Sequence, residues 1–177
     1  MAKCGMGRKV KFIVHRTCLI FSLLFTTVGC DQLTKQLVRD SLPLIGSLSY
    51  LNDSIRFQYA RNPGGFLSLG AGFSEGVRFW VFNVAVSVFL AGLAWTLFHN
   101  RRTRAFTLVG LSLILGGGIG NLIDRFIFGS VTDFLIFGIG PIKTGIFNFA
   151  DTAIVLGAAL IFLANWKPKG ILGAQCR

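Results

Sequence analysis

Charged residues are scarce in this chain of 177 residues: only 14% are Asp, Glu, Lys or Arg, whereas 53% are hydrophobic. A water-exposed surface cannot be built from so few charges, so the composition argues against a soluble protein. Intrinsic disorder is excluded as well, because 18 Phe and 3 Trp would collapse or enter lipid. The composition therefore predicts a membrane protein.

Four long apolar stretches carry this prediction, and they cover about residues 12–29, 79–98, 105–123 and 146–166. A bilayer core of about 30 Å is crossed by about 20 helical residues, and each stretch is near that length. We therefore predict an all-α membrane protein with four transmembrane helices, forming one domain over residues 1–177. An alternative has three spans, with the first stretch removed as a signal peptide.

Basic residues without any acid fill three segments: residues 1–16, residues 99–104 and the tail after Trp166. These segments account for the whole net charge of +11. Short loops rich in Lys and Arg stay cytoplasmic, so both termini and the 99–104 loop are predicted to lie inside. Segments of about 35–78 and 124–145 then lie outside. We expect the basic residues to meet anionic lipid and not nucleic acid, because no basic stripe with interleaved aromatics occurs.

The two outer segments contain more than simple loops. Ser54–Tyr59 has the composition of a β-strand, and Arg61–Gly65 is rich in turn-forming residues. Residues 126–147 are too apolar for a free loop and are expected to form a strand or a re-entrant piece. We predict a small extracytoplasmic β element that rests on the membrane.

Histidine and cysteine are too few and too scattered for most catalytic sites. His15 and His99 fall in cytoplasmic segments, no HExxH sequence occurs, and the four Cys include no CxxC pair. A zinc protease, a disulfide framework and a Cys–His nucleophile are therefore not expected, and we predict no metal and no cofactor. Ser112 has no base partner in the sequence and is expected to bond back to its own helix or pack against another.

Carboxylates remain as the candidates for chemistry. Asp40, Asp53 and Glu75 lie in the long outer segment and are expected to be solvated. An acid at the end of a span is costly and is therefore a functional candidate. The chain has four of these, which are Asp31, Asp124, Asp133 and Asp151.

Neighbouring residues divide these four acids. Asp31 precedes Lys35 by four residues, which predicts an ion pair on one helix face. Arg125 follows Asp124 directly, and a nearby cation favours the ionised carboxylate. Both acids are therefore expected to support the structure or position other groups.

Asp133 and Asp151 have no cation nearby in the sequence. An apolar setting raises the pKa of a carboxyl group, and two close carboxylates can share one proton. One can then act as a base toward water while the other acts as an acid toward a carbonyl, as in aspartic proteases. Both residues belong at the outer interface, so the topology allows them to meet.

Glycines gather at the end of the third stretch, in Gly116–Asn121. Gly116 and Gly120 form a face of small residues that lets helices approach closely. A functional alternative is that the glycines leave room for a substrate backbone, with Asn121 offering an amide hydrogen bond. Asn62 and Asn148 are similar candidates, although position alone gives them little weight.

Taken in chain order, these motifs resemble the bacterial lipoprotein signal peptidases, also called signal peptidase II. The resemblance covers most of the chain and rests on Asp31–Lys35, Arg61–Phe66, Gly116–Arg125, Val131–Phe134 and Phe147–Thr152. Two departures are mild: Gly65 stands where the family often has Ala, and Thr132 where Val is common.

The resemblance implies an aspartic intramembrane protease that cuts prolipoproteins just before a diacylglyceryl-modified cysteine. Asp133 and Asp151 would be the catalytic pair. Five residues would bind substrate or orient the pair, namely Asn62, Gly64, Asn121, Arg125 and Asn148, and three would support the site, namely Asp31, Lys35 and Asp124. The enzyme would be a monomer in the bacterial inner membrane, with its site facing the outer side. Asp151 is expected roughly 8 Å inside the outer end of its span, so cleavage should depend on prior lipidation of the substrate.

Two other classes of protein share some of these features. The protein could itself be a lipoprotein, because Thr27-Val28-Gly29-Cys30 resembles a lipobox, although Thr27 replaces the usual leucine. It could also be a small transporter or channel subunit, although transporter acids usually lie in the middle of the bilayer.

Overall fold

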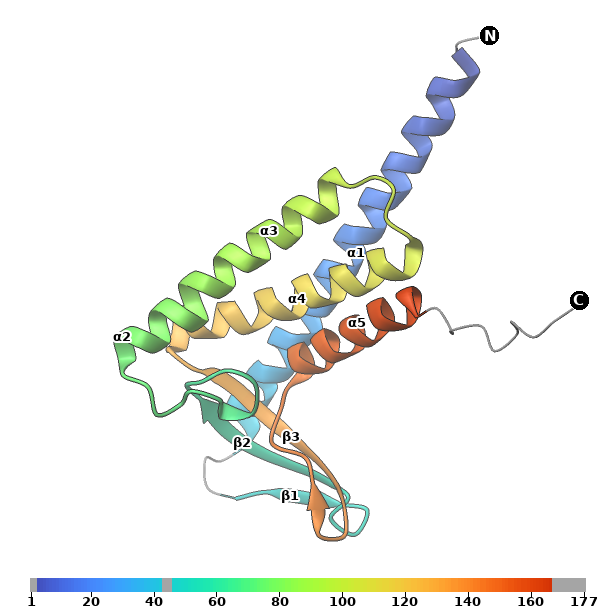
Figure 1. Ribbon diagram of the computed structural model, residues 1–177. Helices are drawn as coiled ribbons and strands as arrows, with labels where there is room; N and C mark the ends of the chain where they lie inside the picture. Colours follow the sequence, from blue (N-terminus) through green and yellow to red (C-terminus); the bar gives the residue numbers. More distant parts are fainter. Residues whose placement is uncertain (1–2, 43–45, 167–177) are drawn as a thin grey trace, which may run out of the picture.

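The computed structural model describes residues 3–42 and 46–166 of the chain. It is mostly helical, with one small sheet (Figure 1). The elements in chain order are α1 (Lys3–Ser41), β1 (Leu48–Tyr50), β2 (Ile55–Asn62), the 3₁₀ turn η1 (Phe66–Ser68), α2 (Glu75–Arg78), the π-helical η2 (Phe79–Ala85), α3 (Val86–His99), α4 (Ala105–Phe128), β3 (Val131–Ile139), β4 (Ile142–Lys143) and α5 (Phe149–Asn165).

Three helices in the described part of the chain are long and apolar enough to cross a membrane: Lys11–Ser41, Glu75–His99 and Ala105–Phe128. The second of these joins α2, η2 and α3 without a break. The fourth predicted stretch forms α5, a shorter apolar helix of 17 residues. The prediction of a mainly helical membrane protein with a small β element is confirmed at this level. The basic tail of residues 167–177, on which part of the charge analysis rests, lies outside the described residues.

Two helices extend beyond their predicted ends. The first apolar stretch was expected to end at about residue 29, but α1 continues to Ser41. The reason is that Asp31, Lys35 and Arg39 follow one another at helical spacing and find buried or half-buried partners, so these charges do not end the helix. Likewise α4 runs on to Phe128, where Gly129 caps it with a φ of 69°. Parts of both predicted outer segments are therefore helical.

The sheet is antiparallel and has the order β1-β2-β3-β4. The strand predicted at Ser54–Tyr59 forms β2. The apolar segment 126–147 forms β3 and β4 after the end of α4, and not a re-entrant piece. Between β2 and β3 the register runs from Ile55 opposite Phe137 to Asn62 opposite Val131, with a bulge between Phe57 and Ala60. This pairing sets Asn62 at the start of β3, close to Asp133.

Asp53 does not behave as the simple solvated acid that we predicted. It lies in the turn between β1 and β2 with a φ of 66° and accepts hydrogen bonds from Ser49 at 2.7 Å and from Arg56 at 2.7 and 3.0 Å. The Lys143 ammonium of β4 also contacts it. These contacts hold the pKa of Asp53 well below its usual range, and the largest effect comes from Lys143, followed by Ser49 and Arg56. Asp53 thus ties the first turn of the sheet to its last strand.

Helix α4 is the centre of the helical bundle, and its glycines make this possible. A Cβ at Gly116 would lie 2.9 Å from Thr27 of α1, and one at Gly118 would lie 2.6 Å from Leu90 of α3. A Cβ at Gly117 would overlap the backbone of Ala150 in α5. The predicted packing role is confirmed for Gly116 and Gly120, which both face α1: a Cβ at Gly120 would lie 2.5 Å from Asp31 Oδ2. Ser112 bonds back to the Leu108 carbonyl at 2.9 Å, as expected.

The helices lie side by side, and the sheet caps one end of the bundle (Figure 1). The N-terminal part of α1 and the α3–α4 connection lie at the opposite end. An apolar core between the helices contains Ile20, Leu90, Leu97, Leu108 and Leu115. The candidate acids lie where the bundle meets the sheet.

Candidate active site

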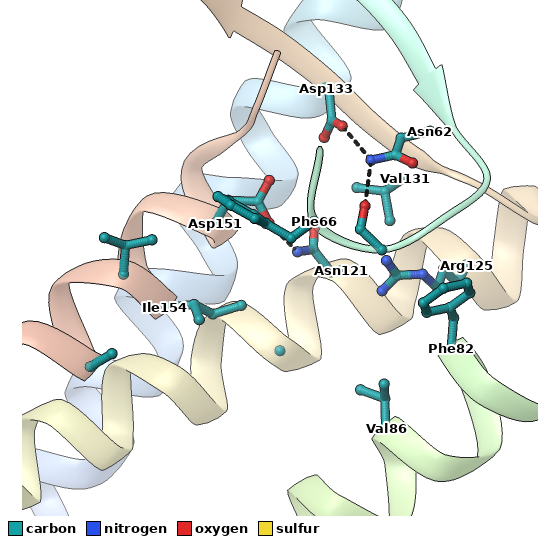
Figure 2. Close-up of a pocket in the computed structure, with 14 residues that line it drawn as sticks. Asn62, Phe66, Phe82, Val86, Asn121, Arg125, Val131, Asp133, Asp151 and Ile154 are labelled. Atoms are coloured by element: carbon teal, nitrogen blue, oxygen red, sulfur yellow. Dashed lines mark hydrogen bonds between the residues drawn. The ribbon is translucent and has the colours of Figure 1, made fainter. Parts of the chain in front are cut away.

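Asp133 and Asp151 line the same cavity, which has a volume of about 430 Å³ (Figure 2). Asp133 is the third residue of β3, and Asp151 is in the first turn of α5. Two residues separate β3 from the end of α4, and α5 packs along α4. The two acids therefore line one cavity because both of their elements adjoin the C-terminal half of α4.

Amide groups hold both carboxylate oxygens of Asp133. Asn62 Nδ2 donates to Oδ2 at 2.9 Å, and Asn148 Nδ2 donates to Oδ1 at 2.6 Å. The side chain is fully buried. Burial raises the pKa of Asp133 to about 6, against the effect of the two hydrogen bonds, which favour the ionised form.

Asp151 is joined to Asp133 through two asparagines. Asn121 Nδ2 donates to Asp151 Oδ1 at 2.8 Å, and Asn148 Nδ2 reaches Asn121 Oδ1 at 3.1 Å as well as Asp133. Asn148 is also the N-cap of α5, because its Oδ1 accepts the backbone N–H of Asp151 at 2.9 Å. The sequence Asp133–Asn148–Asn121–Asp151 is thus one continuous chain of hydrogen bonds.

A buried charge cluster lies behind the asparagines. Lys35 Nζ contacts Asp31 at 2.8 Å, Asp124 at 3.5 Å and the Asn121 side-chain oxygen at 2.9 Å. Lys35, Asp31 and Asp124 are fully buried, and the predicted ion pair between Asp31 and Lys35 is confirmed. Buried charges of this kind are tolerated when they are paired and hydrogen-bonded.

The two acids of the cluster each hold the backbone just before a candidate catalytic residue. Asp31 Oδ1 accepts the N–H of Ala150, which precedes Asp151, at 2.9 Å. Asp124 Oδ2 accepts the N–H of Thr132, which precedes Asp133, at 2.8 Å. Asp31 and Asp124 therefore fix the backbone from which Asp151 and Asp133 project.

The sequence analysis named Arg125 as a cation near Asp124, but other cations form its salt bridges. Its cations are Lys35 and Arg39, at 3.5 and 3.7 Å, and no salt bridge joins it to Arg125 in the described structure. Adjacent residues on a helix do not face each other, so Arg125 points elsewhere. Arg125 Nη2 donates to the Gly64 carbonyl at 2.9 Å, and its guanidinium lies 5.6 Å from the centre of the Phe82 ring.

The predicted turn at Arg61–Gly65 shapes one wall of the cavity. Asn62 Oδ1 accepts the Gly64 N–H at 2.9 Å, and Asn62 Nδ2 donates to the Gly65 carbonyl at 3.0 Å. A Cβ at Gly64 would lie 2.5 Å from the Leu69 carbonyl oxygen, so only glycine fits there. Asn62 therefore holds both the turn and Asp133 (Figure 2).

The ten residues that the resemblance assigned to the site all lie in this one region. The structure adds three that the sequence analysis missed. Gln32 donates to the Gly120 carbonyl at 3.0 Å and to Asp31 and Asp124 at 3.2 Å, and Arg39 donates to Thr132 Oγ1 at 3.1 Å. Phe66 lies beside Asp151 on the cavity wall (Figure 2). Arg39 could have been found from its spacing of four residues after Lys35, whereas Gln32 and Phe66 lie within two of the matching motifs but were given no role.

The chemistry that this arrangement allows is acid–base chemistry by a carboxylate pair. In the described part of the chain neither Asp133 nor Asp151 forms a salt bridge, and no group of three or more His, Cys, Asp or Glu could hold a metal ion. The cavity continues past the acids between Val86 of α3, Gly118 of α4 and Ala158 of α5. A substrate chain lying there would place a peptide bond beside both carboxylates.

The chain is similar in sequence to bacterial lipoprotein signal peptidases and in structure to a bacterial membrane enzyme. It is 37% identical to a lipoprotein signal peptidase of Desulforapulum autotrophicum over 142 residues, covering 80% of this chain and 86% of the relative. It is 35% identical to one of Syntrophotalea carbinolica over 158 residues, covering 89% of this chain and 96% of the relative. A bacterial membrane enzyme solved at 1.9 Å by the in meso method superposes with a TM-score of 0.75 at 26% identity, covering 85% of this chain and 94% of that one.

The family model of signal peptidase II matches residues 23–167, a range that contains every residue of the site described above. The matched range also includes Cys30, which lies within α1 next to Asp31, so the alternative of a lipoprotein cleaved at this cysteine is not supported. The chain belongs to the signal peptidase II family, the proteases that remove the signal peptides of prolipoproteins.

Proposed function

We propose that this protein is an aspartic endopeptidase that removes signal peptides from prolipoproteins, with Asp133 and Asp151 as its catalytic pair. The observation that carries this assignment is the chain of amide hydrogen bonds between the two carboxylates within one cavity. Neither acid has a cation as a direct partner among the described residues. The pair can therefore keep one proton between its members near neutral pH.

The reaction follows from this shared proton. The ionised carboxylate takes a proton from a water molecule, whose oxygen attacks the carbonyl carbon of the scissile bond. The protonated carboxyl group donates to the carbonyl oxygen as negative charge develops there. Collapse of the tetrahedral intermediate breaks the C–N bond, and a proton returns to the leaving amine. No cofactor is required for these steps.

The remaining site residues position the pair and the substrate. Asn62, Asn121 and Asn148 hold the carboxylates through the hydrogen bonds described above, while Asp31, Lys35 and Asp124 hold the asparagine and the backbone behind them. Arg125 is placed to contact the substrate, because it lines the cavity while its Nη2 is held by the Gly64 carbonyl. Gly64 accepts from Arg125 and keeps the wall of the cavity close.

The substrate that fits this site is a prolipoprotein cut just before its diacylglyceryl-modified cysteine. Helix α5 begins at Phe149, so Asp151 lies about 3 Å from the start of the helix, nearer its end than the sequence suggested. The scissile bond must therefore reach the outer interface of the membrane. Acyl chains beside the bond would hold it at this depth.

The same proposal includes the orientation of the chain. We propose four spans within a single peptidase domain over residues 1–177, with both termini and the α3–α4 connection in the cytoplasm and the site facing outward in the bacterial inner membrane. The 17 residues of α5 are at the lower limit of about 17–25 residues for a span. The protein is proposed to act as a monomer, since every group in the mechanism comes from one chain.

A cleavage assay on purified variants tests the catalytic pair. Asp133→Asn and Asp151→Asn should each lower the turnover of a lipidated prolipoprotein by about 10²–10⁴-fold, because one acid cannot do both proton transfers. The double variant should be little worse than either single variant. Asp40→Asn is a matched control, because Asp40 is exposed at the end of α1, away from the cavity. Near-normal turnover by either single variant would refute the assignment.

A further inference from the structure

A second cavity adjoins the first on the other side of Phe66. Its volume is about 450 Å³, and Phe66, Asp151 and Val155 line both cavities. The rest of its wall comes from Leu67, from Phe137 of β3, from the segment before α5 and from α5 itself, namely Thr144, Gly145, Phe147, Thr152 and Leu156. The two cavities thus flank one catalytic carboxyl group.

The walls of the two cavities differ in chemistry. The first contains Asn62, Asn121 and Arg125 beside the acids. In the second, the polar side chains other than Asp151 are Thr144 and Thr152, and both are already engaged. Thr144 Oγ1 accepts the Phe137 N–H at 2.9 Å, and Thr152 Oγ1 donates to the Asn148 carbonyl at 3.1 Å. A peptide there would leave backbone groups without partners, which is costly, whereas a hydrocarbon chain has none to satisfy.

The partition between the cavities is a backbone segment held in an unusual conformation. Leu67 and Ser68 have φ values of 53° and 62°, in the left-handed region that residues with a Cβ rarely adopt. Leu67 packs against Gly145, where any Cβ would overlap its side chain. Such a conformation persists only where the surroundings fix it. The backbone at Leu67 and Ser68 is therefore held in one conformation between the two cavities.

We propose that the second cavity holds an acyl chain of the lipidated substrate cysteine, while the first holds the peptide on the signal-peptide side of the scissile bond. This inference rests on the proposed function. The bilayer is as apolar as the cavity, so moving a chain from lipid into it adds little affinity. The bound acyl chain instead contributes by positioning the substrate. When the chain is fixed beside Asp151, the scissile bond, which adjoins the modified cysteine, lies next to the two carboxyl groups. The effect should therefore appear mainly in kcat, because orientation governs the chemical step.

A variant that fills the cavity provides the test. Leu156→Trp fills the second cavity and leaves the wall of the first unchanged. The full-length protein is assayed with two precursors of the same sequence, whose cysteine carries either dipalmitoyl- or dibutanoylglycerol. Leu156→Trp should lower kcat on the dipalmitoyl precursor by about tenfold and leave the dibutanoyl rate unchanged. The control is Leu163→Trp, an exposed position two turns further along α5 and outside both cavities, which should match the wild type on both precursors.

The outcomes separate the two proposals. An unchanged dipalmitoyl rate in Leu156→Trp, or an equal loss on both precursors, would overturn the acyl-chain site. Failure of the wild type to cut either precursor would instead overturn the proposed function. A second measurement uses a precursor whose acyl chain ends in a photoreactive diazirine. Cross-links should fall on Leu67, Phe137 or Leu156, and cross-links on Phe82 or Val86 of the first cavity would contradict the inference.

Discussion

At the scale of single residues, the orientation of two amide groups determines how the carboxylate pair is held. Asn148 Oδ1 accepts from the backbone of Asp151, so its Nδ2 must face Asp133 and Asn121. Asn121 Oδ1 accepts from Lys35, so its Nδ2 must face Asp151. Lys35, a fully buried lysine, thus fixes how Asp151, a proposed catalytic acid, is held.

The raised pKa of Asp133 predicts the pH dependence of cleavage. The pair needs one proton, and burial raises the pKa of Asp133 to about 6, so kcat should fall as the pH rises above that region. Asn62→Ala removes a hydrogen bond that favours the ionised carboxylate. The pKa of Asp133 should then rise further, and the alkaline limb of the kcat profile should move to higher pH.

The measurement is kcat against pH for the wild type and the Asn62→Ala variant in one detergent. The same shift has a consequence for stability. Burial raises the folded-state pKa of Asp133 above the ordinary value, so the ionised carboxylate disfavours the folded state. The free energy of unfolding should therefore decrease as the pH rises from the ordinary pKa of 3.8 to about 6. An alkaline limb that moves to lower pH in Asn62→Ala would contradict the assignment of this hydrogen bond.

Removal of Lys35 should be strongly destabilising. Lys35→Met leaves Asp31 and Asp124 buried without their shared cation, a change that typically costs about 3–5 kcal/mol. The Tm of the purified protein should therefore fall clearly. Lys143→Met is the matched control, because it removes an exposed ion pair with Asp53 and should leave the Tm almost unchanged. Equal Tm values for the two variants would show that the buried cluster does not stabilise the fold.

At the scale of elements, α4 packs against α1, α3 and α5 and so sets their positions relative to one another. Gly117→Ala would place a methyl group against the Ala150 backbone and push α5 away, which should lengthen the Asn121–Asp151 hydrogen bond. Overpacking of this kind costs about 1–3 kcal/mol, and turnover should fall together with the Tm. Gly92→Ala on α3 is the control, since a Cβ there meets no atom within 4 Å. Normal turnover in Gly117→Ala would show that this contact does not set the site geometry.

The sequence predicted the elements that are determined locally. Apolar length located the helices, and composition located β2. The pairing of Asp31 with Lys35 followed from helical spacing. The ends of α1 and α4 were missed, because hydropathy falls where charges begin, whereas these charges are neutralised by residues remote in sequence such as Asp124.

Contacts between distant segments could not be derived from local pattern. Local pattern allowed Asp133 and Asp151 to lie close together but gave Asn121 and Asn148 little weight, and only the family resemblance assigned these two asparagines, whose hydrogen bonds join the acids, to the site. Local pattern named Arg125 as the cation near Asp124 but gave no sign that Lys35 and Arg39 form the salt bridges, or that Arg125 donates to Gly64. It also contained no sign of the Leu67 backbone conformation, which depends on packing against Gly145.

At the scale of the whole molecule, charge and architecture agree on an orientation that can be measured. The sheet lies at one end of the bundle and the arginine-rich α3–α4 connection at the other (Figure 1). In a background without native cysteines, Asn52→Cys should react with an impermeant maleimide added to intact cells. Arg102→Cys should react only after the membrane is opened. Labelling of Arg102→Cys from outside would reverse the proposed topology.

The order of the site residues along the chain has a consequence for synthesis. Asp31 lies on the first helix, Asp133 on a late strand and Asp151 on the last helix, so the pair exists only after α5 has docked on α4. On the proposed mechanism, a nascent chain with three of its four proposed spans in place has Asp133 but lacks Asp151. The protease is therefore silent during its own insertion, and needs no removable propeptide to keep it from cutting too early.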